Sequence, residues 1–193
     1  MELQEVYRQI AECRACGLCR GRTNPVPGEG CTEHPLVMCI GEGPGEQEDL
    51  SGRPFVGPAG QLLDKMLACI GLDRTNTYIA NVVKCRPPMN RQPEWEEMQA
   101  CLPHLRAQVR ILRPRILFCL GATAGKAIID PNFRVTRQRG QWIERKGFYM
   151  MATYHPSALL RDKSGQYKRE AYEDLKKLKA KIDELTQQEM STE

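Results

Sequence analysis

Short apolar runs alternate along this chain with amphipathic segments, and this alternation constrains the fold more than any other feature. The apolar runs that predict strands are 36–40, 78–83, 116–120 and 149–154. The segments with apolar residues at helical spacing are 2–13, 57–70, 94–112, 122–129 and 168–186. Strands that alternate with helices predict an α/β protein, a three-layer α/β/α fold around a central, mostly parallel four-stranded sheet.

Two other stretches are less regular. Residues 133–154 alternate basic, polar and aromatic side chains, which predicts strands with a turn near Lys146 and Gly147. Residues 21–35 are rich in Gly, Pro and Thr and are predicted to be loop. A length of 193 residues is enough for one compact domain. We therefore expect residues 1–193 to form a single domain with a disordered tail from about 187 to 193.

Charge is unevenly distributed along the chain. Residues 1–50 carry 4 basic and 9 acidic groups, a balance of −5, whereas residues 51–160 carry 16 and 7, a balance of +9. A basic middle region suits a phosphate-rich partner such as nucleic acid, although scattered cations on a solvated surface would give the same balance. No apolar run of 18 residues and no signal-peptide pattern occurs, so a cytoplasmic monomer without a membrane span is expected.

Nine cysteines are many for a chain with no export signal, and disulfides are not expected in a reducing compartment. Cys13 and Cys16 have the spacing of paired thiolate ligands, and Cys85 and Cys101 are candidates for a second pair. Four thiolates fit zinc or an iron–sulfur cluster. Cys16 and Cys19 form a rival pair, and several unconnected cysteines are the other interpretation. The cysteines within apolar runs, predicted to be core residues, are Cys39, Cys69 and Cys119; Cys31 is unassigned.

A glycine-rich loop, 41–45, directly follows the first predicted strand. Such a loop can bind phosphate, but this one has neither the Walker lysine nor GxGxxG spacing. It contains Glu42, with Glu46, Glu48 and Asp49 close behind, and these acids would repel a phosphate. They could instead orient a water molecule or bind a neutral polar base. A tight turn with solvated acids is the alternative.

Further candidates lie at or near other strand ends. Asn81 ends the second predicted strand, and His155 follows the last one. Because sites in parallel α/β sheets lie beyond the carboxyl ends of the strands, we expect Asn81, His155 and the glycine loop to converge. Pro156 holds His155 in an extended conformation, although a lone histidine is often only a surface or capping residue. Phe55, in a Gly- and Pro-rich loop, could stack on a planar ligand or plug the domain.

These motifs together resemble the family-4 uracil-DNA glycosylases, the thermostable type that carries a [4Fe–4S] cluster. The matching segments are 41–63 (GEGPGEQEDLSGRPFVGPAGQLL), 78–93 (YIANVVKCRPPMNRQP), 120–121, 139–142 (RGQW) and 154–161 (YHPSALLR). The resemblance runs from Cys13 to about Arg161. A related branch binds uracil covalently through a histidine in an inserted loop, which this sequence lacks after Gly60. Ordinary turnover is therefore expected.

The resemblance implies a role for each matching residue. The implied cluster ligands are Cys13, Cys16, Cys85 and Cys101, which favours Cys13 over Cys19. The implied uracil pocket consists of Gly41, Glu42, Gly43, Phe55, Asn81 and His155. Phe55 would stack on the base, and Asn81 would read its polar edge. His155 would stabilise the departing uracil anion, and Glu42 would position the attacking water. The segment 159–161 (Leu159, Leu160 and Arg161) would fill the gap left by the flipped base.

The function that the resemblance implies is excision of uracil from single- or double-stranded DNA, as the first step of base excision repair. Flipping the base out of the duplex makes its glycosidic bond accessible. The alternative is a non-catalytic nucleic-acid-binding module that uses the same cysteines as a metal site. A sliding-clamp partner is compatible with the sequence, but no segment of the tail matches a clamp-binding motif.

Overall fold

A computed structural model describes residues 2–145 and 147–191. Its strands form one sheet in the order β1-β3-β2-β4-β6-β5. The strands are β1 (Glu29–Gly30), β2 (Val37–Gly41), β3 (Thr77–Asn81), β4 (Ile116–Leu120), β5 (Ile143–Arg145) and β6 (Phe148–Thr153). The four central strands, β3, β2, β4 and β6, are parallel. The predicted four-stranded parallel core is confirmed, and the described sheet has two additional edge strands.

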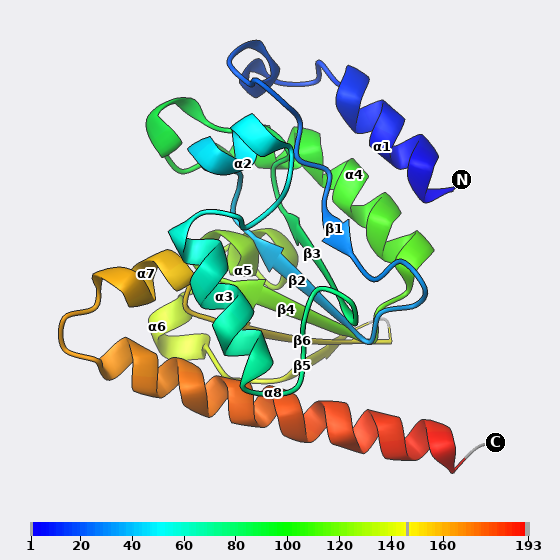
Figure 1. Ribbon diagram of the computed structural model, residues 1–193, viewed down its shortest axis with the longest axis vertical. Helices are drawn as coiled ribbons and strands as arrows, with labels where there is room; N and C mark the ends of the chain where they lie inside the picture. Colours follow the sequence, from blue (N-terminus) through cyan, green and yellow to red (C-terminus); the bar gives the residue numbers. More distant parts are fainter. Residues whose placement is uncertain (1, 146, 192–193) are drawn as a thin grey trace.

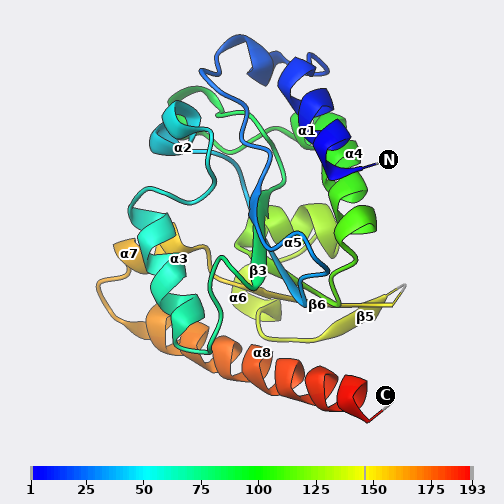
Figure 2. The ribbon, with the colours of Figure 1, turned by 45° about the vertical axis from the view of Figure 1, so that its right-hand side comes forward.

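Helices cover both faces of this sheet (Figures 1 and 2). The α-helices are α1 (Leu3–Glu12), α2 (Glu46–Ser51), α3 (Pro58–Ala68), α4 (Trp95–Leu112), α5 (Ala122–Ile128), α6 (Val135–Gln138), α7 (Pro156–Arg161) and α8 (Gln166–Met190). Two 3₁₀ turns, η1 (Gly17–Arg20) and η2 (Pro88–Asn90), complete the described elements. In the described part of the chain, no helix has the length and apolar character needed to cross a bilayer.

Strands β2, β3 and β4 are buried at every position, so their alternate side chains enter two separate cores. On one face Met38 and Ile40 pack with Leu102 and Leu105 of α4 and with α5. On the other face Val37 and Cys39 pack with α3 and α8. Helix α1 lies on α4 as an outer layer beside the first core. This arrangement confirms the predicted three layers.

Several local predictions were wrong. Residues 135–138 form α6 instead of strand, because Val135 packs against both cores as the chain crosses from α5 to β5. The predicted loop 21–35 contains the edge strand β1, which pairs antiparallel with β3. Helix α8 continues to Met190, past the predicted start of the tail, and residues 192–193 lie outside the described residues. The predicted turn near Lys146 and Gly147, in contrast, agrees with the turn at Gly147, whose φ is 80°, whereas Lys146 lies outside the described residues.

Candidate active site

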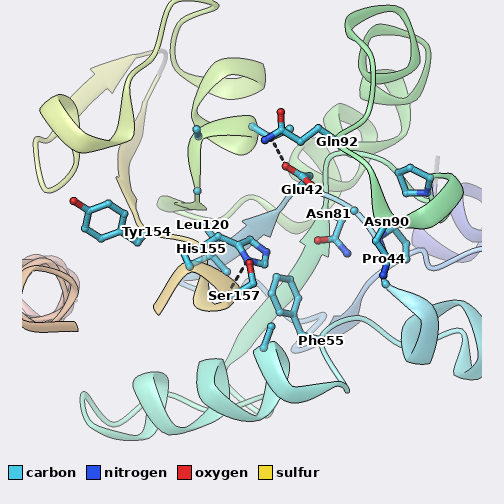
Figure 3. A pocket seen from close by; sticks show the side chains of 18 of the residues that line it. Glu42, Pro44, Phe55, Asn81, Asn90, Gln92, Leu120, Tyr154, His155 and Ser157 are labelled. Atoms are coloured by element: carbon cyan, nitrogen blue, oxygen red, sulfur yellow. Dashed lines mark hydrogen bonds between the residues drawn. The ribbon is translucent and has the colours of Figure 1, made fainter. Parts of the chain in front are cut away.

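A cavity of about 570 Å³ opens at the carboxyl edge of the parallel strands. Gly41 and Asn81 are register partners at the ends of β2 and β3, and His155 follows β6 by two residues. Figure 3 shows Glu42, Phe55, Asn81 and His155 around this cavity, although they come from four separate segments. The predicted convergence at the sheet edge is therefore confirmed.

Close approach at Gly41 brings two of these side chains together. A β-carbon at residue 41 would overlap with Oδ1 of Asn81 and with the ring of Phe55. Asn81 is 1% exposed, and its Oδ1 is the one buried side-chain oxygen or nitrogen within the described residues that has no hydrogen-bond partner. Leaving a buried acceptor unpaired costs about 1–3 kcal/mol. The site therefore presents an acceptor that a donor on a ligand would satisfy.

Phe55 is fixed through its backbone. Its φ is 52°, a left-handed conformation that is unfavourable for an aromatic residue. Arg74 donates hydrogen bonds to the carbonyl oxygens of Pro54 and Phe55. The carboxylate of Glu48 accepts hydrogen bonds from the backbone amides of Val56 and Gly57, the two residues that follow Phe55. These contacts hold the Phe55 ring 5.7 Å from the ring of His155, centroid to centroid, with both rings lining the cavity.

His155 caps the N-terminus of α7 and is extended, with φ −66° and ψ 139°, as predicted for a residue before proline. Its Nδ1 accepts a hydrogen bond from the backbone amide of Ser157 at 3.1 Å. In a neutral imidazole the proton is therefore on Nε2. Burial, together with the nearby charge of Arg161, lowers the pKa of His155 to about 4. His155 is a neutral Nε2–H donor at physiological pH.

Glu42 lies in the cavity opposite these rings (Figure 3). Thr123, near the start of α5, donates a hydrogen bond to its Oε2. Burial raises the pKa of Glu42, whereas the Thr123 hydroxyl and the charge of Arg161 act in the opposite direction. The backbone of Glu42 is also fixed, because its carbonyl accepts from the amide of Val83.

The other acids of this region have structural partners. Glu48 accepts a hydrogen bond from the amide of Gly45 as well as from the amide of Val56. Its carboxylate therefore joins the glycine loop to the loop that contains Phe55. Asp49 is buried and accepts from the backbone amides of Thr23 and Asn24. Glu46 pairs with Arg86 at 3.7 Å. Of the four acids in the sequence motif, only Glu42 and Glu48 line the cavity.

Helix α7 forms one rim of the cavity and contains the predicted wedge. Leu159 is 2% exposed and belongs to the core beneath α3 and α8, so it is not available to enter DNA. Leu160 is 50% exposed, and Arg161 lines the cavity. The wedge prediction therefore narrows to Leu160, with Arg161 beside it.

The four cysteines implied as ligands come from separate segments of the chain but gather at one place. Cys13, Cys16, Cys85 and Cys101 line one small cavity between α1 and α4, and Cys19 lines it too. Arg22 donates to Sγ of Cys85 at 3.2 Å, and the backbone amide of Lys84 donates to Sγ of Cys101 at 3.3 Å.

The thiols are within electrostatic reach of one another. Burial raises the pKa of Cys85, Arg22 acts in the opposite direction, and Cys16 and Cys13 make smaller contributions that raise it. Burial also raises the pKa of Cys101 to about 11, with smaller contributions from Cys85 and Cys16. Within residues 2–145 and 147–191 no three His, Cys, Asp or Glu side chains are arranged around one ion. A multi-iron cluster needs no such convergence, because each thiolate binds a different iron.

The remaining cysteines divide between core and surface. Cys39 and Cys119 are fully buried in the strands, as predicted. Cys69 is exposed at the end of α3, which corrects its assignment to the core. Cys31 is partly buried, and its thiol lies 3.7 Å from the carbonyl oxygen of Glu33.

Sequence reasoning missed two residues that hold the site together. Thr123 follows the Leu120-Gly121 segment, and a polar residue at the start of a helix after a buried strand was the available signal. Arg74 has no local sequence signal, because its carbonyl partners lie 19 and 20 residues earlier. Their roles emerge only from the folded chain.

The fold and site define a class of α/β protein whose cavity, at the carboxyl edge of a parallel sheet, is lined by aromatic, amide and imidazole side chains. Comparison with known proteins agrees with this class: the model of the uracil DNA glycosylase superfamily matches residues 27–176. The chain is 45% identical over 184 residues to a type-4 uracil-DNA glycosylase from Thermotoga maritima, and the match covers 94% of this chain and 95% of that protein.

Two archaeal proteins give similar matches. The identity is 44% to a type-4 uracil-DNA glycosylase of Pyrobaculum aerophilum, over 83% of this chain and 86% of the relative. The identity is 45% to a type-4 uracil-DNA glycosylase of Archaeoglobus fulgidus, and the match covers 82% of this chain and 83% of that protein. The chain belongs to the uracil DNA glycosylase superfamily and, within it, to the type-4 uracil-DNA glycosylases.

Proposed function

We propose that this protein excises uracil from DNA by hydrolysing its N-glycosidic bond. The observation that supports this most directly is the unpaired, buried Oδ1 of Asn81 beside the ring of Phe55. Uracil carries an N3–H donor next to the O4 acceptor, which complements the two ends of a side-chain amide. Cytosine presents the opposite pattern, so a fixed amide would reject it by leaving polar groups unmatched.

His155 acts on the leaving group. Cleavage of the bond between C1′ and N1 leaves its electron pair on uracil, and the negative charge spreads to O2. A neutral Nε2–H donor stabilises that charge without transferring its proton. The Ser157 amide on Nδ1 maintains this tautomer. Since uracil leaves as a fairly stable anion, a strong acid is not required.

Glu42 acts on the sugar and on the attacking water. Positive charge develops on the sugar as the bond breaks, and a carboxylate nearby stabilises it. The same carboxylate orients a water molecule, whose oxygen bonds to C1′ and whose proton passes to Glu42 or solvent. The Thr123 hydrogen bond favours the ionised form that both roles need.

The cysteine site fits a [4Fe–4S] cluster held by Cys13, Cys16, Cys85 and Cys101. The support is chemical: the donor set is four thiols around one cavity, and N–H donors reach two of the sulfurs. When bound, such a cluster would supply a cross-link between the N-terminal segment and α4 rather than redox chemistry. Cys19 lines the same cavity and is the rival for the position of Cys13.

DNA would reach the cavity across a rim that carries Arg91 and Arg161. Arg161 can contact phosphates, whereas the guanidinium of Arg91 is held in an ion pair with Glu97 at 2.8 Å. Leu160 lies exposed on the same rim helix as Arg161 and has the size to occupy the gap left by a flipped base.

The experiment is a strand-cleavage assay on anaerobically purified protein. End-labelled oligonucleotides with one uracil or one cytosine, single-stranded and paired, are incubated with it and then treated with alkali. We expect cleavage at uracil alone. His155→Ala should slow release by about 10²-fold or more while keeping DNA binding. His34→Ala, on a different groove, is the matched control and should cleave normally. DNA binding by the wild type without uracil release would favour the non-catalytic module.

A further inference from the structure

Lys84 is a buried lysine that the proposed chemistry does not use. It is 1% exposed and lies three residues beyond β3. Lysine is rarely buried unless it is paired, yet no carboxylate lies within ion-pair distance of Lys84 in the part of the chain that the structure describes. Burying an ammonium without a carboxylate is costly. The specific contacts of this side chain therefore need an explanation.

The ammonium donates hydrogen bonds to two acceptors. Nζ of Lys84 donates to the backbone carbonyl of Asn81 at 2.9 Å and to Oε1 of Gln108 at 2.8 Å. Gln108 is fully buried in α4, and its Nε2 donates to the carbonyl of Pro27 and to the hydroxyl of Tyr78. The Lys84 ammonium is thus held from behind by a network that spans α4, β3 and the N-terminal loop.

The backbone of Lys84 is bound as well. Its amide donates to Sγ of Cys101, and its carbonyl accepts from the amide of Val26 at 2.8 Å. Residue 84 therefore contacts the base-recognition strand through its side chain and the four-cysteine site through its main chain. Neither end of this residue can move without disturbing one of the two sites.

We propose that Lys84 is a positioning residue that fixes the Asn81 amide for base recognition and anchors it to the four-cysteine site. Asn81 is the last residue of β3, and the amide of the next residue, Val82, donates to the carbonyl of Gly41 at 2.9 Å. The strand pairing therefore holds the amide side of the peptide group that follows Asn81. The Lys84 ammonium holds the carbonyl side, so that the two contacts together fix the peptide plane. A fixed plane points the side chain at the space beside Gly41, which is the orientation that discrimination between uracil and cytosine requires.

This inference rests on the proposed uracil-excising function and is tested beside it. Lys84→Met keeps the length of the side chain and removes only the ammonium. Iron and sulfide content are measured first, so that variants are compared at equal occupancy. The binding of free uracil is then measured by calorimetry, and single-turnover excision gives the rate separately from affinity. Lys65→Met, at an exposed position of α3, is the matched control.

In the wild-type background Lys84→Met should weaken uracil binding about tenfold or more. This is the effect expected when the charge-assisted hydrogen bond from Lys84 to the Asn81 carbonyl is lost. The deciding measurement is a double-mutant cycle with Asn81→Ala. If Lys84 acts through Asn81, the effect of Lys84→Met on uracil binding falls below about twofold once Asn81 is absent. An unchanged effect in the Asn81→Ala background overturns the proposal, because it would then reflect general loosening of the fold.

Gln108→Leu is a second route if Lys84→Met does not fold or load iron. It leaves the Lys84 contact to Asn81 in place but removes the group that holds the ammonium from behind. Uracil binding should weaken in this variant too, again only while Asn81 is present, and full wild-type affinity contradicts the proposal. Wild-type protein that neither binds nor excises uracil refutes the proposed function itself. Normal wild-type excision with no coupling to Asn81 refutes only the role of Lys84.

Discussion

The Nδ1 atom of His155 lies 3.1 Å from the backbone nitrogen of Ser157 and 2.8 Å from its hydroxyl oxygen. The backbone contact cannot be reversed, since an amide only donates. One ring nitrogen of His155 is therefore always occupied by the start of its own helix, and the other is left as a donor to the cavity. The tautomer depends on local backbone geometry and persists when neighbouring side chains are replaced.

Burial of neutral His155 makes stability depend on pH. Its pKa is about 4 in the folded protein and 6.5 in an unfolded chain, so between these values the unfolded state binds the proton and the folded state does not. The free energy of unfolding should fall by about 1–3 kcal/mol as pH drops from 6.5 to 4. Urea unfolding at several pH values measures this, and His155→Asn should lack that part of the slope. Equal slopes would contradict a depressed pKa.

Removal of the Asn81 amide should separate activity from stability. Asn81→Ala removes the unpaired buried Oδ1, and relief of about 1–3 kcal/mol offsets the lost packing. We expect kcat/KM for uracil to fall by about 10²-fold or more, with the urea midpoint nearly unchanged. Asn132→Ala, at an exposed position, is the control. A large drop in stability together with activity would show that Asn81 has a structural partner.

A methyl group at residue 41 should damage the site from the backbone side. Gly41→Ala places a carbon against Asn81 and Phe55, which must both shift. We expect a loss of about 1–3 kcal/mol in stability from overpacking and a marked loss of uracil binding. Gly21→Ala is the control, because a β-carbon added at residue 21 would have no neighbouring atom within 4 Å. This variant should be neutral in both measurements. Unimpaired uracil binding by Gly41→Ala would show that the two side chains need not approach so closely.

The acidic limb of the pH–rate profile should depend on Thr123. Its hydroxyl favours ionised Glu42, so Thr123→Val raises the pKa of Glu42 further. If excision requires the carboxylate, the acidic limb of the profile moves to higher pH, and the plateau at alkaline pH changes little. Single-turnover rates across pH measure the shift, with Thr186→Val on α8 as the control. An unshifted profile would remove Glu42 ionisation from the mechanism.

The rival cysteines can be separated by iron content. Cys13→Ala should lose iron and sulfide and lower the midpoint of thermal unfolding, because α1 is then no longer cross-linked to α4. Cys19→Ala should keep full iron content. Cys69→Ala, at an exposed thiol, controls for general effects of cysteine removal. The reverse result for Cys13 and Cys19 would reassign the ligand.

The central fold could be predicted from sequence because its signals are local. The runs 36–40 and 116–120 are apolar at every position, which a parallel strand buried on both faces requires. The convergence of Asn81 and His155 then followed from topology alone. Edge elements were missed because tertiary contacts form them: β1 has two residues and exists only by pairing with β3.

The supporting contacts of the site could not be predicted from sequence. Glu48 belongs to an acidic cluster that indicated a solvated turn or a polar site, yet its carboxylate accepts from three backbone amides. Leu159 and Leu160 are equivalent in sequence, and only the orientation of α7 buries one and exposes the other. Such distinctions depend on a few degrees of helix rotation, which local residue patterns do not specify.

The attachment of α1 to α4 has a consequence for synthesis. Cys13 and Cys16 leave the ribosome before Cys85 and Cys101, and the cavity that the four share forms only after α4 has emerged. The thiols of Cys13 and Cys16 therefore stay uncovered while the chain up to α4 is synthesised, at about 5–20 residues each second. During that interval they are open to oxidants and to stray metals. Assembly of this protein should thus be most sensitive to cellular redox state while it is still being made.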